Sequence, residues 1–187
     1  ERNGTNNWLM SHQPLSASLG DYTRFITLNS NAAVSGAGNV VFQSSAFTSS
    51  VFNVGTSAGS NGSGQNYIAY CFAEKKGYSK FAIYTGNANA EGTFIHTGFK
   101  PAFIMLKPTS TTGNWFILDN KRNSFNVVDQ YIRGNLNNAD ATFSMVDFVS
   151  NGVKIITSDA SINGSGVSYI YMAFAENPFV GNDSGTA

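Results

Sequence analysis

Short runs in which apolar and polar residues alternate recur along the chain, and they predict β-strands. Residues 80–86 (KFAIYTG) and 92–98 (GTFIHTG) alternate in this way and are joined by an Asn/Ala/Glu/Gly stretch, which is typical of a hairpin. Residues 102–107 (AFIMLK) form a continuous apolar run after Pro101, as expected of a central strand that is buried on both faces. The pattern therefore predicts paired strands around a buried central one.

The same pattern continues through the second half of the chain. We expect further strands at residues 114–119, 143–150, 152–158 and 168–176. No window keeps an apolar period of 3.6 residues over three turns, and only residues 127–139 are compatible with a short helix. The chain is thus predicted to be all-β, with an antiparallel β-sandwich or jelly-roll-like architecture.

A stretch near the middle of the chain returns near its end. Residues 61–74 (NGSGQNYIAYCFAE) and residues 163–176 (NGSGVSYIYMAFAE) are identical at nine of fourteen positions without a gap. The similarity extends upstream, where Asn7 and Trp8 match Asn114 and Trp115. The chain therefore contains two related repeats, and its function has to be understood through them.

The first repeat lacks the beginning of the second. Three strand signals, including residues 102–107, precede Trp115, whereas only seven residues precede Trp8. We predict a partial first repeat, a complete second repeat and a flexible C-terminal tail, at residues 1–76, 77–180 and 181–187.

A sandwich without a central strand exposes unpaired backbone groups and apolar side chains, so this gap has to be covered. Residues 78–113 could serve both halves. We favour instead polypeptide upstream of Glu1 or strands from a neighbouring chain, and we expect a homo-oligomer or fibre with a contact at residues 1–76.

The repeated strand is apolar on both faces. Tyr67, Ala69, Cys71 and Ala73 share one face, and the intervening Ile68, Tyr70 and Phe72 share the other. Such a strand is expected at the centre of a sheet, with Cys71 as a small core residue. We expect Tyr67, Ile68 and Phe72 to occupy the same core positions as their counterparts in the second repeat, Tyr169, Ile170 and Phe174.

Charge and cysteine content narrow the range of partners. Only 12% of the 187 residues are charged and the net charge is zero, which argues against a nucleic-acid partner and against a polybasic membrane contact. No apolar run has the length of a membrane span, so we expect no membrane insertion. The single cysteine excludes an internal disulfide.

Candidate catalytic and metal-binding residues are few. Residues 55–59 (GTSAG) match the Gly-x-Ser-x-Gly hydrolase motif, which would make Ser57 a nucleophile, but a polar loop rather than a helix is expected to follow it and Asp159 takes its place in the second repeat. Neither His12 nor His96 has a second histidine or cysteine at ligand spacing. We therefore expect no catalytic residue, no cofactor and no metal site.

The two matched tryptophans suggest a sugar-binding hypothesis. An exposed indole can stack on a sugar while neighbouring polar side chains bind its hydroxyl groups. The two equivalent sites would consist of Trp8 with His12, and of Trp115 with Asp119 and Asn120. The alternative is that both tryptophans are core residues of the repeat, because Trp115 begins an apolar strand.

Several longer stretches carry a resemblance to a known family. The segments YIAYCFAEKKGYSKFAIYTGN, HTGFKPAFIMLK, NWFILDNKRN and YIYMAFAENPF resemble a repeat module of tailed-bacteriophage structural proteins, notably from phages of marine bacteria. The resemblance covers nearly all of residues 5–180, and the family's function is largely unknown.

The resemblance implies a lectin-like sandwich in a non-enzymatic virion structural or appendage protein, such as a tail fibre, a head fibre or a capsid decoration. It also implies a location on the virion surface, with the chain itself and other virion proteins as partners. The alternative is a tail-fibre module that binds a host receptor or a host surface glycan. The family brings no established catalytic or binding residues to this chain.

Overall fold

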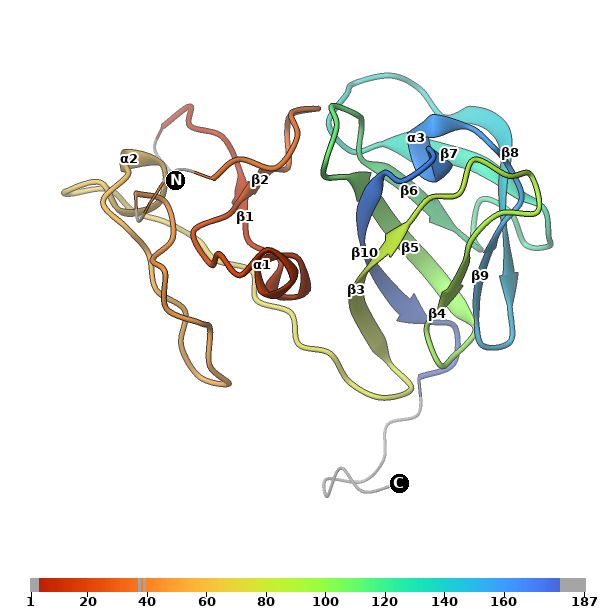
Figure 1. The fold of residues 1–187 in the computed structure, drawn as a ribbon, viewed down its shortest axis with the longest axis horizontal. Helices are drawn as coiled ribbons and strands as arrows, with labels where there is room; N and C mark the ends of the chain where they lie inside the picture. Colours follow the sequence, from red (N-terminus) through yellow and green to blue (C-terminus); the bar gives the residue numbers. More distant parts are fainter. Residues whose placement is uncertain (1–3, 37, 39, 179–187) are drawn as a thin grey trace.

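The computed structural model describes residues 4–36, 38 and 40–178, and most of its regular structure is β-sheet (Figure 1). Eight antiparallel strands form one sheet in the order β3-β10-β5-β6-β7-β8-β9-β4. Their bounds are β3 Ser79–Thr85, β4 Phe94–His96, β5 Pro101–Pro108, β6 Phe116–Asp119, β7 Val128–Arg133, β8 Ala141–Val149, β9 Gly152–Ile155 and β10 Ser168–Ala175. The predicted all-β antiparallel fold is confirmed.

The sheet curls until its two edge strands approach each other. The edges β3 and β4 are consecutive in the chain, and near them the Thr93 hydroxyl donates a hydrogen bond to the Thr85 carbonyl at 2.9 Å. The inner face of the curl holds the main core, which takes buried side chains from all eight strands, among them Tyr84, Ile95, Leu106, Leu118, Tyr131, Val146, Val153 and Tyr171. The nearly closed sheet therefore surrounds its own hydrophobic core.

β10 has a neighbouring strand on each side in this sheet, next to the edge strand β3, although it is the last strand in the sequence. It pairs with β3 from Ser168 to Phe174 and with β5 from Tyr169 to Ala175. Tyr169, Tyr171 and Ala173 point into the main core, whereas Ile170 and Met172 lie on the outer face. The two apolar faces seen in the sequence are explained by this central, doubly covered position.

Residues 9–34 cover the outer face of the sheet and form a second core with it. This segment contains β1 (Leu9–Met10), α1 (Gln13–Leu19) and β2 (Ile26–Thr27), and β1 pairs with β2. Leu15 and Ile26 pack there against Met105, Trp115 and Ile170. In Figure 1, α1 lies beside β3 and β10.

Two long side chains fasten this N-terminal segment to the sheet. The buried indole of Trp115 donates its N–H to the Thr27 carbonyl at 3.1 Å. Lys107 on β5 donates from Nζ to the carbonyls of Asn31, Pro108 and Gly113 at 3.3, 3.4 and 2.7 Å. Burial lowers the pKa of Lys107 to about 8. The two parts of the chain are thus joined by polar contacts as well as by an apolar interface.

The structure corrects two local expectations. Residues 127–139, the best candidate for a short helix, contain strand β7 instead, because a register shift between Val128 and Gln130 places two buried residues three positions apart and so imitates a helical period. A helix that the pattern did not indicate is α1, whose seven residues make only two turns. Pro14 stands at its start, and Gly20 ends it with φ of 64°.

The first repeat forms little regular structure apart from α1, β1 and β2. The described residues between 40 and 74 contain a short helix, α2 (Ala58–Asn61), and an isolated pairing of Phe42 with Val54. Residues 66–73 belong to no sheet and run from α2 towards β3 as the yellow coil in Figure 1. Cys71, expected in the core, is exposed because the strand that would contain it has no neighbours.

The predicted division between the repeats, after residue 76, falls just before β3 at Ser79. The eight strands of the sheet end at Ala175, within the predicted second repeat. The predicted tail at residues 181–187 lies outside the described residues.

Candidate functional site: an exposed apolar segment

In the second repeat, a compact turn leads into β10. Asp159 accepts a hydrogen bond from the Ser161 N–H at 2.7 Å and so caps α3 (Ala160–Asn163). The Tyr169 hydroxyl donates to the Ala160 carbonyl at 2.6 Å and accepts from the Gly164 N–H at 2.8 Å. The turn is thereby tied to the first residues of the strand that follows.

The first repeat builds the same turn with the same contacts. Ser57 caps α2 by accepting from the Gly59 N–H at 3.2 Å. The Tyr67 hydroxyl donates to the Ala58 carbonyl and accepts from the Gly62 N–H at 2.7 Å. Gly64 and Gly166 have φ of 70° and 69° at matched positions. The sequence repeat is therefore a structural repeat through this turn.

This comparison also explains Ser57. Its side chain has the same capping role as the carboxylate of Asp159, and serine and aspartate are both favoured at that position. The Gly-x-Ser-x-Gly match thus reflects a helix cap in a repeated turn.

Immediately after the turn, the two repeats diverge. Residues 168–175 enter the sheet as β10, but the matched residues 66–73 remain outside any sheet. Tyr70 is 66% exposed and Phe72 is 61% exposed. We call residues 66–73 the apolar segment, because every residue from Tyr67 to Ala73 is apolar or aromatic.

The neighbours of the apolar segment enlarge its aromatic surface. Tyr70 stacks on Trp8 with ring centroids 6.2 Å apart. Phe72 lies 6.3 Å from Phe81 on β3 and 6.1 Å from Phe174 on β10. Directly after the segment, Glu74 pairs with Lys80 at 2.6 Å. This surface has the apolar and aromatic character that is enriched in the buried centre of protein–protein interfaces.

The first of the two predicted sugar sites is not assembled as expected. Trp8 is 50% exposed, but the neighbouring ring is that of Tyr70. His12 is buried and donates from Nε2 to the Tyr171 carbonyl at 3.2 Å. Its burial lowers the pKa of the imidazole to about 4. His12 therefore supports the packing of residues 9–34 and presents no surface to a ligand.

In the second predicted sugar site, Trp115 is only 2% exposed. Its ring therefore offers no face on which a sugar could stack. The alternative, that both tryptophans are core residues, agrees with Trp115 but not with Trp8. Asp119 pairs with Arg122, and the Asn120 amide donates to Glu176 at 2.7 Å. The structure does not make equivalent sites of Trp8 and Trp115.

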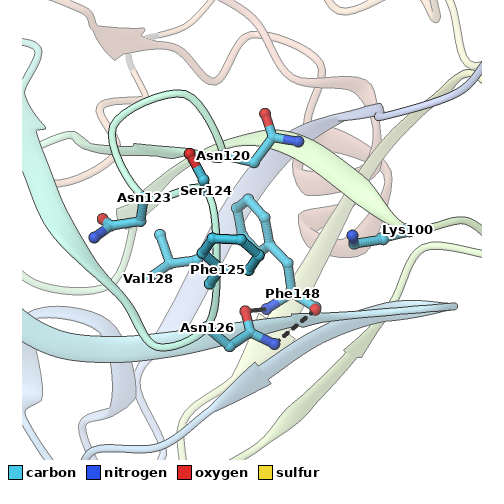
Figure 2. A pocket seen from close by; sticks show the side chains of 8 residues that line it. All are labelled: Lys100, Asn120, Asn123, Ser124, Phe125, Asn126, Val128 and Phe148. Atoms are coloured by element: carbon cyan, nitrogen blue, oxygen red, sulfur yellow. Dashed lines mark hydrogen bonds between the residues drawn. The ribbon is translucent and has the colours of Figure 1, made fainter.

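A hollow that the sequence analysis missed lies beside the loop between β6 and β7 (Figure 2). It measures about 210 Å³ and is lined by Lys100, Asn120, Asn123, Ser124, Phe125, Asn126, Val128 and Phe148. Phe125 is 86% exposed. The Asn126 side chain makes two hydrogen bonds, both at 2.9 Å, to the backbone of Phe148 and so holds the loop against β8. The Asn- and Ser-rich sequence NKRNSFN is the signal that could have indicated this loop.

A known family matches almost the whole chain, including both repeats. Residues 1–178 match the model of a domain of unknown function, DUF7483. The chain belongs to this family. No curated protein and no solved structure matches the chain.

Neither a metal-ligand cluster nor a membrane-spanning helix occurs in the described part of the DUF7483 domain. Within residues 4–36, 38 and 40–178, no group of three or more His, Cys, Asp or Glu side chains is placed to hold a metal ion. None of the helices in that same part of the chain is long and apolar enough to cross a membrane.

Proposed function

We propose that this chain is a non-enzymatic structural or appendage module of a bacteriophage particle, which assembles with copies of itself and with other virion proteins on the particle surface. The observation that carries the assembly role is the apolar segment, with Tyr70 and Phe72 exposed in the middle of the chain. Exposed apolar patches of this kind mark surfaces that bind other proteins.

The position of the aromatic residues favours assembly over sugar recognition. A lectin is expected to present aromatic rings at the tip of a loop, whereas Tyr70, Phe72, Phe81 and Phe174 lie along an extended segment and the sheet beside it. The non-enzymatic character is supported by the helix-capping role of Ser57. The phage setting rests on the resemblance of the four quoted segments to virion repeat modules.

The assembly role is tested by measuring the molar mass of the chain in solution over a range of concentrations. We expect self-association that weakens when Tyr70→Ser and Phe72→Ser are combined. Phe143→Ser is the matched control, because Phe143 is an exposed aromatic residue on β8, outside the aromatic surface. Equal association of the double variant and the control would contradict the role that we assign to the apolar segment.

The virion location needs a separate experiment. Antibodies raised against the chain should label purified particles of a phage that encodes it, and electron microscopy should show the label on the particle surface. Labelling confined to lysed host material, with clean particles unlabelled, would refute the location.

Host glycan binding is the second candidate function, and the loop hollow is the observation that favours it. Phe125 stands exposed among the asparagine side chains of that loop, so an aromatic ring and amide groups occur together. Glycan-array binding that is lost in Phe125→Ala and retained in Phe143→Ala would support this candidate. The absence of binding to any glycan on the array by the unmodified chain would reject it.

A further inference from the structure

We propose that the apolar segment is a β-strand that pairs with strands of the β3 and β5 type from another copy of this repeat, one in which no β10 lies between those strands. The inference deepens the proposed assembly role by naming the partner, and it rests on that role. It concerns residues 66–73, which match β10 residue for residue.

The second repeat shows directly what covers such a segment. After the shared turn, β10 pairs along its whole length with β3 on one side and β5 on the other. The turn of the first repeat has an equivalent helix cap, the same tyrosine contacts and the same glycine conformation. Residues 66–73 therefore leave this turn from the same local geometry as β10 does. What the first repeat lacks is the pair of neighbouring strands.

The side chains of the apolar segment are suited to a central strand. Cys71 occupies the position of Ala173, which is 0% exposed in the main core. On the opposite face, Ile68 matches Ile170, which is buried beneath residues 9–34. A strand that is apolar on both faces is typical of positions with a neighbour on each side and a layer above and below.

The backbone of the apolar segment points to the same conclusion. In the described part of the chain, residues 66–72 have no strand neighbour, whereas every residue from Ser168 to Ala175 has one. Unpaired backbone groups beside an apolar surface are a template for strand addition.

The β3 and β5 strands of the same fold cannot supply the missing pairing. Both already hold β10 between them, from Ser168 to Ala175, and Ala175 also donates from its N–H to the Tyr78 carbonyl at 2.9 Å. Insertion of the apolar segment at that place would displace a strand of nearly the same sequence. The partner is therefore a further copy of the repeat in which no β10 strand occupies the place between the β3- and β5-type strands.

The single cysteine of the chain reports on this pairing. Cys71 is exposed now and would be buried in a completed repeat, as Ala173 is. The missing strands can be supplied by a variant in which a second set of residues 77–107 is placed before Glu1. The spacing of the second repeat is then kept, because Trp8 follows the end of the added set at the same distance as Trp115 follows residue 107.

We expect this addition to slow alkylation of Cys71 by at least about a hundredfold and to protect the amides of residues 66–73 from hydrogen exchange. The matched control carries Ile104→Asp and Leu106→Asp in the added set only, and Cys71 should remain reactive in it. Fast alkylation in a folded, intact addition variant would overturn the proposal. Slow alkylation of Cys71 in the dilute, unmodified monomer would also overturn it, because the same chain would then cover the segment.

If the extended chain fails to fold, a synthetic peptide of residues 99–109 tests the β5-type strand alone. Excess peptide should slow alkylation of Cys71 in the unmodified chain, and a scrambled peptide should not. Equal rates with both peptides would contradict the proposal.

Strand pairing and the assembly role can fail separately. Self-association of the unmodified chain, together with fast alkylation of Cys71 in the folded addition variant, would reject strand pairing and leave the assembly role intact. Protection by the added strands in a chain that never self-associates would support strand pairing and reject the assembly role.

Discussion

Asn163 and Asn61 occupy the same position in the repeated turn, but their surroundings differ. Asn163 is fully buried and joins three parts of the chain: its side-chain N–H groups donate to the carbonyls of Thr157 and Asn89 at 2.7 and 2.9 Å, and its Oδ1 accepts from the Asn87 N–H at 2.9 Å. Asn61 is exposed and makes the first of these contacts only, to the Gly55 carbonyl at 2.9 Å.

We therefore expect Asn163→Ala to lower the free energy of unfolding by about 3 kcal/mol, because it leaves buried polar groups without partners. Asn61→Ala is the matched control, with an expected loss of about 1 kcal/mol or less. Urea denaturation of the two variants measures the difference. Equal losses would show that burial of the turn does not distinguish the two repeats.

His12 gives the molecule a predictable response to pH. Burial lowers its pKa to about 4 from an ordinary value of 6.5. Between these values the unfolded chain binds a proton that the folded chain excludes, so stability is complete above pH 6.5 and falls as the pH is lowered. We expect a loss of about 2 kcal/mol between pH 7 and pH 5, measured by urea denaturation. His12→Gln should remove this dependence, and His96→Gln, at an exposed position, should retain it.

At the scale of single elements, the repeated strand sequence has two different environments in one molecule. A cysteine moved from one to the other should therefore change its reactivity. In the double variant Cys71→Ala, Ala173→Cys, the thiol lies in the main core, and we expect it to react with a thiol reagent only when the protein unfolds. The thiol of the unmodified chain should react under native conditions. A fast reaction of the core thiol in a folded variant would place β10 outside the sheet.

Most strands of the sheet could be predicted because alternating apolar and polar residues, and continuous apolar runs, reflect which side chains of a strand are buried. Residues 102–107 predicted a doubly covered central strand, and β5 (Pro101–Pro108) has β10 and β6 as neighbours. The pattern failed at β7, where the register shift spaces two buried residues like a helix. The pattern also predicted a central strand at residues 66–73, which lie outside any sheet. The apolar pattern shows which environment such a strand requires, but it does not show whether neighbouring strands are present.

The candidate surface was foreseen only in part. The number of residues before Trp8, compared with the number before Trp115, indicates that the first repeat lacks strands. From this we expect a contact with another chain within residues 1–76. The burial of Trp115 and His12 could not be foreseen, since it depends on the docking of residues 9–34 onto the outer face of β5, β6 and β10. Long-range packing of this kind leaves no periodic signal in a single sequence.

At the scale of the whole molecule, Trp115 connects the N-terminal segment with the sheet. Trp115→Ala removes a buried ring and its hydrogen bond to Thr27, so we expect a loss of about 4 kcal/mol. Proteolysis after Arg24, which lies in the docked segment, should become faster. Trp8→Ala is the control and should cost less than about 1 kcal/mol, because Trp8 is half exposed. Urea denaturation and limited trypsin digestion measure the two effects, and similar results for both variants would contradict this role of Trp115.

The central place of β10 has a consequence for synthesis of the chain on the ribosome. β3 and β5 are translated long before residues 168–175, yet each is paired with β10 and not with the other. Until those last residues leave the exit tunnel, β3 and β5 have no strand between them, and the main core is exposed at that place. Because domains with such distant pairings fold slowly and expose apolar surface meanwhile, production of this protein should depend on chaperones that bind nascent chains.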